Sequence, residues 1–215
     1  MFKLCLVTDR KQLYKGMSLE RVVRLAVKNG ADAVMLREKE IEDASCLLAL
    51  AEKIKKASGK AKFIVNARCD IALAVKASGV HLSGTSISIK QARKLLGQKK
   101  LIGKSCHSQK DACLAQKEGA DYIILGPLFY TESKAKYGKP LSCDIISKLK
   151  STGRFKIPVI GIGGITPENT GEVMKAGASG VAVISGIIKA KDPGKAAKLY
   201  RKAIKSTRYE VQSTK

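Results

Sequence analysis

The segment VIGIGGITPEN (residues 159–169) joins an apolar run, a pair of glycines and a Thr-Pro-Glu sequence at 166–168. The run predicts a buried strand, and the Thr-Pro-Glu sequence predicts that a helix follows at once. Glycines at 163 and 164 let backbone N–H groups approach a ligand closely, and a helix start presents unpaired N–H groups with a partial positive charge. Both features suit a phosphate. An ordinary strand-to-helix turn is the alternative.

The same alternation of a short apolar run and a longer amphipathic segment recurs along the chain. Apolar runs predict strands at residues 4–9, 33–38, 62–67, 79–83, 101–105, 122–126, 158–163 and 180–185. Amphipathic segments predict helices at residues 18–29, capped by Ser18, and at 42–57, 70–77, 88–96, 108–118, 142–150, 167–176 and 193–205. Strands this apolar favour an α/β fold with a parallel sheet covered by helices, and eight units favour a single (β/α)8 TIM barrel. An open, doubly wound sheet is the alternative.

The composition suits one soluble domain. With 215 residues and 45% hydrophobic content the chain can bury a real core, and we expect a single domain over residues 1–207 followed by a polar tail over 208–215. No signal-peptide pattern and no apolar run of about 18 residues occurs, so a cytoplasmic location is expected with no membrane partner. The six cysteines form no CxxC pair and no metal-ligand spacing with histidine, which predicts free thiols.

The strong positive charge does not by itself identify a partner. A formal net charge of +23 attracts anions, whether phosphorylated metabolites or nucleic acid. The lysines are scattered over nearly every predicted helix, and aromatic residues make up only 5% of the chain, without the interleaved pattern of single-strand binders. We therefore expect a lysine-rich solvated surface and no nucleic-acid partner.

Polar residues directly after the apolar runs are candidates for an active site, because the carboxyl ends of the strands build the site of a TIM barrel. Arg37 offers a planar fork that suits phosphate oxygens, and Lys39 offers a mobile point charge. Glu38 between them would point elsewhere on an extended segment. A surface ion pair is the alternative for these residues.

Two later loops also carry anion-binding chemistry. The loop at 126–140 holds Thr131, Ser133 and Lys134, which favours a mobile flap that grips an anion, with a solvated charged loop as the alternative. The glycine pair at 163–164 and Ser185-Gly186 follow the last two strands, where barrels often hold a phosphate between neighbouring loops.

The segment KSCHS (104–108) supplies a candidate for proton transfer. His107 could move protons near neutral pH, although a lone histidine is more often structural. Ser105 and Cys106 point in opposite directions on a strand, and we expect Ser105 to face the ligand and Cys106 to pack. The candidate catalytic residues are therefore His107 and Ser105, together with Lys134.

Taken in order, these segments resemble the family of thiamin phosphate synthase and its relative, the thiazole tautomerase TenI. The resemblance covers essentially the whole chain and rests on LREK (36–39), VNARCDIALA (65–74), GVHL (79–82), IGKSCHS (102–108), GADYIILGPLF (119–129), IPVIGIGGITPEN (157–169) and GVAVISGI (180–187). It implies a TIM barrel that binds a thiazole phosphate. In the synthase it also implies an aminopyrimidine methyl pyrophosphate, whose pyrophosphate leaves as the thiazole nitrogen attacks. A homodimer is a further expectation.

The resemblance also implies which residues contact each substrate. The pyrimidine pyrophosphate contacts match Arg37, Lys39, Asn66, Ser105 and Lys134. The thiazole phosphate contacts match Thr131, Ser133, Gly164, Ile184 and Ser185, which places a phosphate above Gly163 and Gly164.

The chain departs from both branches of this family. The two aspartates that bind magnesium in the synthase are matched by Ala67 and Ser86, and a pyrimidine-contacting glutamine is matched by Met35. No cofactor is therefore expected, with magnesium expected only for a synthase. Magnesium prefers carboxylate and phosphate oxygens, so a synthase would need compensation from Arg37, Lys39, Arg68 or Lys134, or from a relocated ligand such as Asp70. The proton-transferring histidine of TenI is matched by Pro127.

Three functional interpretations follow. The first is a TenI-like protein, which the segments VNARCDIAL, LSGTSIS and RYE (208–210) favour, with His107 as its proton-transfer group. The second is a working thiamin phosphate synthase, which the Arg37–Lys39 pair and the loop at 131–134 favour. The third is a phosphate-ligand sensor or regulatory protein without catalysis, which the loss of both hallmarks favours, together with a basic surface that could meet nucleic acid. The first is the main expectation.

Overall fold

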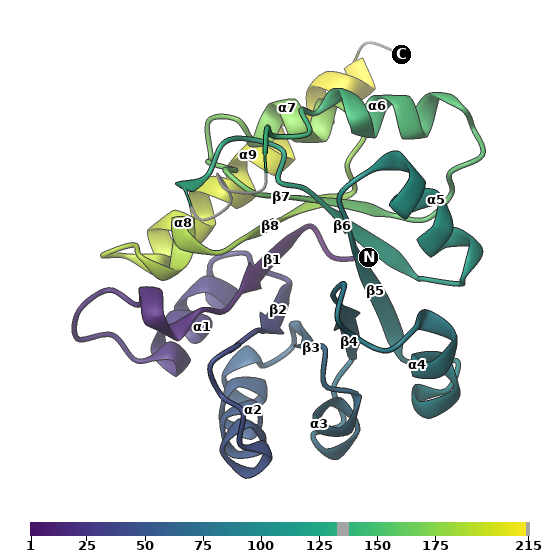
Figure 1. Cartoon of the computed structure of the whole chain (residues 1–215). Helices are drawn as coiled ribbons and strands as arrows, with labels where there is room; N and C mark the ends of the chain where they lie inside the picture. Colours follow the sequence, from purple (N-terminus) through teal and green to yellow (C-terminus); the bar gives the residue numbers. More distant parts are fainter. Residues whose placement is uncertain (133–137, 214–215) are drawn as a thin grey trace.

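The computed structural model describes residues 1–132 and 138–213, without the side chains of 208–213. Eight parallel strands close into a barrel, because β1 pairs with β8 as well as with β2 (Figure 1). The strands are β1 (Leu4–Val7), β2 (Ala33–Leu36), β3 (Lys62–Asn66), β4 (Gly79–Leu82), β5 (Leu101–Cys106), β6 (Tyr122–Leu125), β7 (Val159–Ile162) and β8 (Gly180–Val183). The predicted (β/α)8 barrel is confirmed, and the open sheet is excluded.

Helices surround the barrel and connect successive strands (Figure 1). They are α1 (Leu19–Lys28), α2 (Ala44–Ser58), α3 (Cys69–Ala74), α4 (Ile89–Leu96), α5 (Gln109–Lys117), α6 (Asp144–Ser151), α7 (Thr170–Lys175), α8 (Ser185–Ile188) and α9 (Pro193–Ser213), with a 3-10 turn η1 (Arg10–Gln12). Ser18 caps α1 as predicted, since its hydroxyl accepts a hydrogen bond from the Arg21 N–H. The short helices η1 and α8 were not predicted, because so few residues show no helical periodicity.

The helix predicted at 167–176 begins later, at Thr170. Residues 167–169 form a turn, which a reciprocal pair of hydrogen bonds closes. The Thr166 N–H donates to the Asn169 side-chain oxygen at 2.8 Å, and the Asn169 N–H donates to the Thr166 hydroxyl at 3.4 Å. The predicted start signal was therefore real, but it caps a turn that precedes the helix.

The last helix is longer than expected and closes the outer layer. The helical backbone of α9 continues to Ser213, past the predicted end at 205 and through most of the segment 208–215 that we expected to be a polar tail. It packs against α1 and α7, so the last helix of the chain lies beside the first α-helix (Figure 1). No helix in the described part of the chain is long and apolar enough to cross a membrane. The domain boundary at 207 stays a prediction.

Within the described residues, one helix-to-strand turn recurs before each even-numbered strand. Its first residue has a left-handed backbone, with φ of 120° at Gly30, 51° at Lys76, 90° at Gly119 and 99° at Gly177. Its second residue is a buried alanine whose N–H bonds back to the preceding helix: Ala31 to Ala26, Ala77 to Ala72, Ala120 to Ala115 and Ala178 to Val173. Such bonds are typical of glycine-terminated helices.

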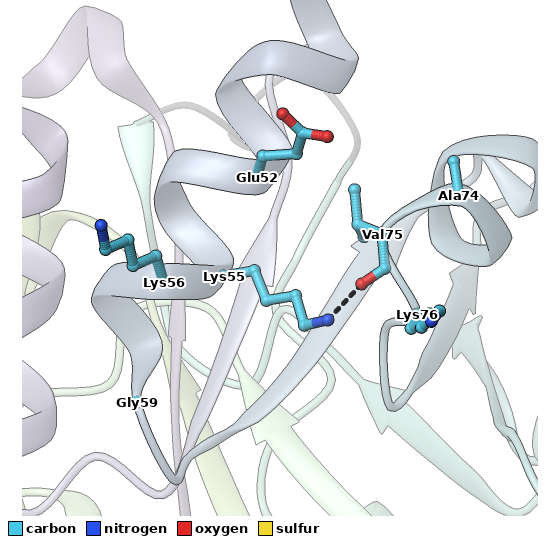
Figure 2. A pocket seen from close by; sticks show the side chains of 7 residues that line it. All are labelled: Glu52, Lys55, Lys56, Gly59, Ala74, Val75 and Lys76. Atoms are coloured by element: carbon cyan, nitrogen blue, oxygen red, sulfur yellow. Dashed lines mark hydrogen bonds between the residues drawn. The ribbon is translucent and has the colours of Figure 1, made fainter.

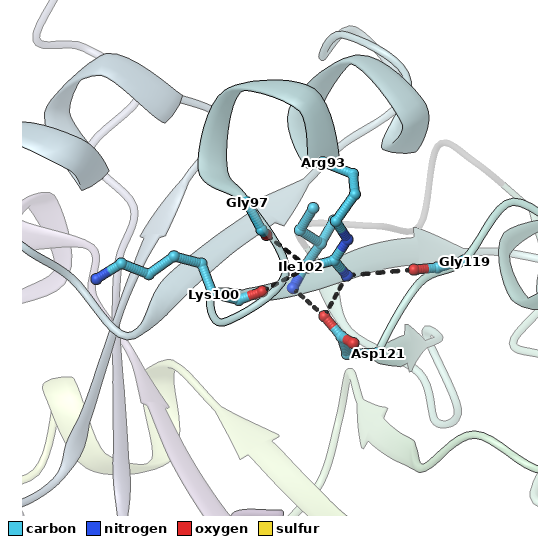
Figure 3. A network of polar contacts seen from close by, with 6 residues as sticks. All are labelled: Arg93, Gly97, Lys100, Ile102, Gly119 and Asp121. Carbon is cyan, nitrogen blue, oxygen red and sulfur yellow. Dashed lines mark hydrogen bonds and ion pairs between the residues drawn. The ribbon is translucent and has the colours of Figure 1, made fainter.

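The third residue of each turn sets the strand register. The N–H groups of Asp32, Ser78, Asp121 and Ser179 donate to Leu4, Phe63, Ile102 and Val159, respectively, on the preceding strand. The Asp121 carboxylate also accepts from the Ile102 N–H at 2.7 Å and from the Arg93 guanidinium at 2.7 Å (Figure 3). The Arg93 guanidinium also donates hydrogen bonds to the carbonyls of Gly97, Lys100 and Gly119. One side chain therefore joins α4, the start of β5 and the turn before β6.

The core has two layers that alternate along each strand. One layer fills the space between strands and helices, and the other fills the barrel. Inside the barrel, the Tyr122 ring packs edge-on against Phe2, with 5.2 Å between the ring centroids. Gly103 makes room for this ring, because a Cβ atom there would lie 2.1 Å from Tyr122 Cζ. Interior residues recur at alternate positions, such as Ala33 and Met35 on β2 and Tyr122 and Ile124 on β6, so the inward face can be followed along these strands.

Replacement of Lys76 by glycine should stabilise the protein. Lys76 is exposed and holds φ of 51° where the three equivalent turns have glycine. A left-handed conformation costs a residue with a Cβ atom about 1–2 kcal/mol, of which the greater chain entropy of unfolded glycine offsets a part. We expect Lys76→Gly to raise the free energy of unfolding in urea by about 0.5–1 kcal/mol. Lys76→Ala is the control, and an equal gain in that variant would show that the lysine side chain, rather than the backbone, is responsible.

Candidate functional site

Three of the expected ligand contacts lie together at the carboxyl end of the barrel. Arg37 and Asn66 each lie two residues after an interior side chain, Met35 on β2 and Ile64 on β3, and therefore continue the same inward face. Ser105 lies on the inward face of β5. All three expected contacts are partly buried, and the side chains of Arg37 and Asn66 hydrogen-bond to no residue that the structure describes. They remain available to a ligand.

Met35 itself lies in the apolar interior beneath these residues. Its side chain is 2% exposed and belongs to the same interior cluster as Val7 and Ile64. Thr8, also buried, uses its hydroxyl to accept a hydrogen bond from the Arg37 N–H at 3.0 Å. Thr8 is one of the polar residues that end the apolar runs, and its hydroxyl orients the backbone that carries Arg37.

Glu38 points away from the ligand face, as expected for the residue between Arg37 and Lys39. The residue is 6% exposed, and its carboxylate accepts from the Arg10 N–H at 3.0 Å, which ties the loop after β2 to η1. Burial raises the pKa of this carboxyl. Lys39 is exposed and takes part in a polar interaction within the structure.

Ser105 and Cys106 face opposite sides of β5, as predicted. The Cys106 thiol is fully buried in the layer between strands and helices, where burial raises its pKa to about 12. The Ser105 hydroxyl lies on the other side, 2.8 Å from Nε2 of His81. Ser105 is therefore both a candidate ligand contact and the partner of a buried histidine.

His81 is a residue that the sequence analysis missed. Its ring is 3% exposed and stacks on Tyr122, with 5.7 Å between ring centroids. Burial, assisted by the charge of Lys104, lowers the pKa of His81 to about 3, so the ring is neutral. The missed signal is the alternation within GVHL, which puts His81 on the inward face opposite Asn66 of β3.

His107 gains a partner that the sequence did not reveal. Nδ1 of its exposed ring lies 2.6 Å from the Gly126 carbonyl oxygen, and the backbone N–H of His107 donates to the Asp111 carboxylate at 3.0 Å. A carbonyl can only accept, so neutral His107 carries its proton on Nδ1 and presents Nε2 as a base. The ring is thus held beside Pro127, the position at which the resemblance expects the TenI histidine.

The glycine pair makes room for the loop that follows β6 and also exposes backbone N–H groups. Gly163 and Gly164 have φ of 93° and 64°, and a Cβ atom on them would lie 2.6 Å from Pro127 and 2.5 Å from the Tyr130 carbonyl oxygen. The loop is held there by a hydrogen bond from the Phe129 N–H to the Gly163 carbonyl at 3.0 Å. The structure thus adds a packing reason for glycine that the sequence did not reveal.

Unpaired N–H groups gather after the last two strands. Across the described part of the chain, the N–H groups of Gly163, Gly164, Ser185 and Gly186 donate to no protein acceptor. Ser185 and Gly186 begin α8 and are exposed, while Ile184 before them packs against the barrel interior. These backbone groups suit the oxygens of a phosphate.

The long loop after β6 is only partly described. Thr131 is partly buried and takes part in a polar interaction. Ser133 and Lys134, two of the expected contacts, lie outside the described residues. Their contribution to the site stays a prediction.

The residues at the family's magnesium positions do not fit that ion. Ala67 offers no oxygen ligand from its side chain, and the Ser86 hydroxyl closes a turn by accepting from the Ser83 N–H at 2.9 Å. Asp70 forms a two-bond ion pair with Arg68, with N–O distances of 2.9 and 2.5 Å. The described residues contain no group of three or more His, Cys, Asp and Glu side chains that could hold a metal.

A surface crevice of about 470 Å³ lies elsewhere, between the ends of α2 and α3 (Figure 2). Its walls include Lys55, whose ammonium group donates to the Val75 carbonyl, and Lys76. Helices α2 and α3 end where β3 and β4 begin, so this crevice lies at the opposite end of the barrel from Arg37 and Ser105. It is not part of the candidate site.

Comparisons with known proteins identify the family of the chain. Residues 4–187 match the family model described as thiamine monophosphate synthase. A putative thiamine-phosphate synthase of Geobacter sulfurreducens is 43% identical over 89% of each chain, and a thiamine-phosphate synthase of Clostridium acetobutylicum is 41% identical over 88% of each. The structure of thiamine phosphate pyrophosphorylase from Pyrococcus furiosus superimposes with a TM-score of 0.82 at 32% identity, covering 95% of this chain and 96% of that one. The chain therefore belongs to the thiamine monophosphate synthase family.

Proposed function

We propose that the protein is a thiamin phosphate synthase, a transferase that joins a thiazole phosphate to an aminopyrimidine methyl pyrophosphate and releases pyrophosphate. The observation that carries the proposal is the presence of two separate sets of anion-binding groups at one end of the barrel. Arg37 after β2, Asn66 on β3 and Ser105 on β5 form one set, and the unpaired N–H groups after β7 and β8 form the other. A reaction of two phosphorylated substrates needs both sets, whereas a tautomerase needs one.

The two sets suit different parts of the reaction. The backbone N–H groups at Gly164 and Ser185 would hold the thiazole phosphate, which does not react, and so orient the thiazole nitrogen. The Arg37 guanidinium would neutralise the pyrophosphate as the carbon–oxygen bond breaks and the carbon–nitrogen bond forms. Asn66 and Ser105 would add uncharged hydrogen bonds to the same substrate. The net charge of +23 favours the approach of both anions.

This proposal departs from our main expectation of a TenI-like protein. The named relatives favour the synthase, and the two anion-binding sets agree with it. Since the residues at 67 and 86 do not fit magnesium, we assign no step to a protein-held metal ion. Placement in the TenI branch and the homodimer stay predictions.

Loss of the Arg37 guanidinium should abolish most of the transferase activity. We expect Arg37→Ala to lower kcat/KM for thiamin phosphate formation by about 10²–10³-fold, because it removes a preorganised charge from the departing pyrophosphate. The product is measured by chromatography after incubation with both substrates. Arg24→Ala is the control, since it removes the same charge from the exposed face of α1. Equal rates in the two variants, or no product from the unmodified protein, would contradict the synthase.

An aspartate at position 67 should give the protein a response to magnesium. Ala67 has φ of 63°, a conformation that Asp and Asn adopt more readily than Ala. We expect Ala67→Asp to raise magnesium-stimulated turnover about tenfold or more, because the new carboxylate supplies a hard oxygen ligand beside the pyrophosphate contacts. Ala67→Asn has the same shape without the charge and is the matched control. The same gain in both variants would mean that relief of backbone strain is the cause.

The tautomerase remains a second candidate because of the position of His107. The Gly126 carbonyl fixes its Nδ1 proton and leaves Nε2 as a base beside Pro127. In this case His107→Asn should lower the rate of thiazole phosphate aromatisation by about 10²–10⁴-fold, since the amide can still bond to the carbonyl but cannot accept the proton. Aromatisation is followed by ultraviolet absorbance. An undiminished rate in the variant would reject this candidate.

A further inference from the structure

We infer that His81 is a positioning residue that fixes the Ser105 hydroxyl as a hydrogen-bond donor toward an anionic ligand. The inference starts from the 2.8 Å contact between His81 Nε2 and Ser105 Oγ, which joins β4 to β5 inside the barrel. The identity of the ligand, a pyrophosphate oxygen, rests on the proposed function. The orientation of the hydroxyl does not.

The ring of His81 has little freedom to move. It is 3% exposed and lies on the inward face of β4, where it stacks on Tyr122 at an interplanar angle of 29°. Tyr122 is itself fully buried and fitted against Gly103, so the surface under the ring is rigid. Nε2 therefore meets the Ser105 hydroxyl from a fixed direction.

The protonation state of the ring follows from its surroundings. Burial holds the pKa of His81 near 3, and the ammonium group of Lys104 acts in the same direction. The neutral ring has one N–H, and its Nδ1 atom is buried without a partner among the described residues. A buried N–H without an acceptor is rarer in proteins than a buried acceptor without a donor. The proton is therefore on Nε2, which donates to Ser105.

This donation decides what Ser105 can do. A hydroxyl has one proton and two lone pairs, and His81 occupies one lone pair. The proton of Ser105 must then point to another acceptor, and its side chain is partly exposed at the end of the barrel that carries Arg37 and Asn66. Ser105 is thus prepared to donate to an anion, whereas a histidine with the proton on Nδ1 would consume that donation.

Substitutions at His81 and Ser105 test this coupling. We expect His81→Leu to lower kcat/KM by about 10–100-fold, the usual effect of losing a hydrogen bond to a charged group. His81→Gln places an N–H near the Nε2 position and should recover most of the activity. In the Ser105→Ala background, His81→Leu should cost nothing further. An equal loss with and without the Ser105 hydroxyl would overturn the inference, because His81 would then act only through packing.

Tyr122→Phe is the control for a change in the packing beneath the His81 ring. It removes a buried phenol oxygen without a described partner from the ring beneath His81 and leaves the contact with Ser105 intact. We expect unchanged kcat/KM in this variant. A loss as large as that of His81→Leu would again indicate a packing effect.

A measurement that needs no turnover separates this inference from the proposed function. Nitrogen-15 NMR of the histidine rings should show His81 protonated on Nε2 only, with no titration between pH 8 and pH 5. A proton on Nδ1, or a charged ring, would overturn the inference. Calorimetric titration with inorganic pyrophosphate should show weaker binding to His81→Leu than to the unmodified protein and His81→Gln, and equal binding to all three would count against it. If the unmodified protein forms no thiamin phosphate, the synthase proposal fails and these two readouts still decide the role of His81.

Discussion

The left-handed turn that precedes each even-numbered strand is the constraint on which the rest of the barrel depends. It ends a helix, buries an alanine and brings the next residue into hydrogen-bonding distance of the preceding strand. A shift of one residue at this point would exchange the inward and outward faces of the strand. The direction of Arg37 after β2, and of His81 within β4, therefore follows from turns at the opposite end of the barrel.

The pairing of adjacent strands explains how the candidate site is built from distant parts of the chain. Ser105 and His81 are 24 residues apart in sequence, and the Ser105 hydroxyl reaches the ring only because β4 and β5 are adjacent. His107 reaches the Gly126 carbonyl through the pairing of β5 with β6. The barrel thus converts polar residues at successive strand ends into a ring of groups that face one another.

The candidate site is rich in hydrogen-bond donors and poor in free carboxylates. Position 67 holds an alanine in a backbone conformation that suits aspartate better, and Asp70 is neutralised by Arg68. The ligand-facing groups that remain are a guanidinium, an amide, a hydroxyl and backbone N–H groups, all of which can donate hydrogen bonds to anions. Such groups suit the oxygens of a phosphate, and the formal net charge of +23 attracts anions in general.

The amino-acid sequence alone determined the eight units, the Ser18 cap and the opposite directions of Ser105 and Cys106, because these features depend on periodicity and on neighbouring residues. The eight units favoured a closed barrel over an open sheet, and the pairing of β1 with β8 decided between the two. Tertiary structure alone decided the partners of His81 and His107, because hydrogen bonds between residues far apart leave no local pattern. It also decided that Gly163 and Gly164 admit a loop from β6. A glycine looks the same in sequence whether a ligand or another part of the chain lies above it, and only the packed structure distinguishes the two.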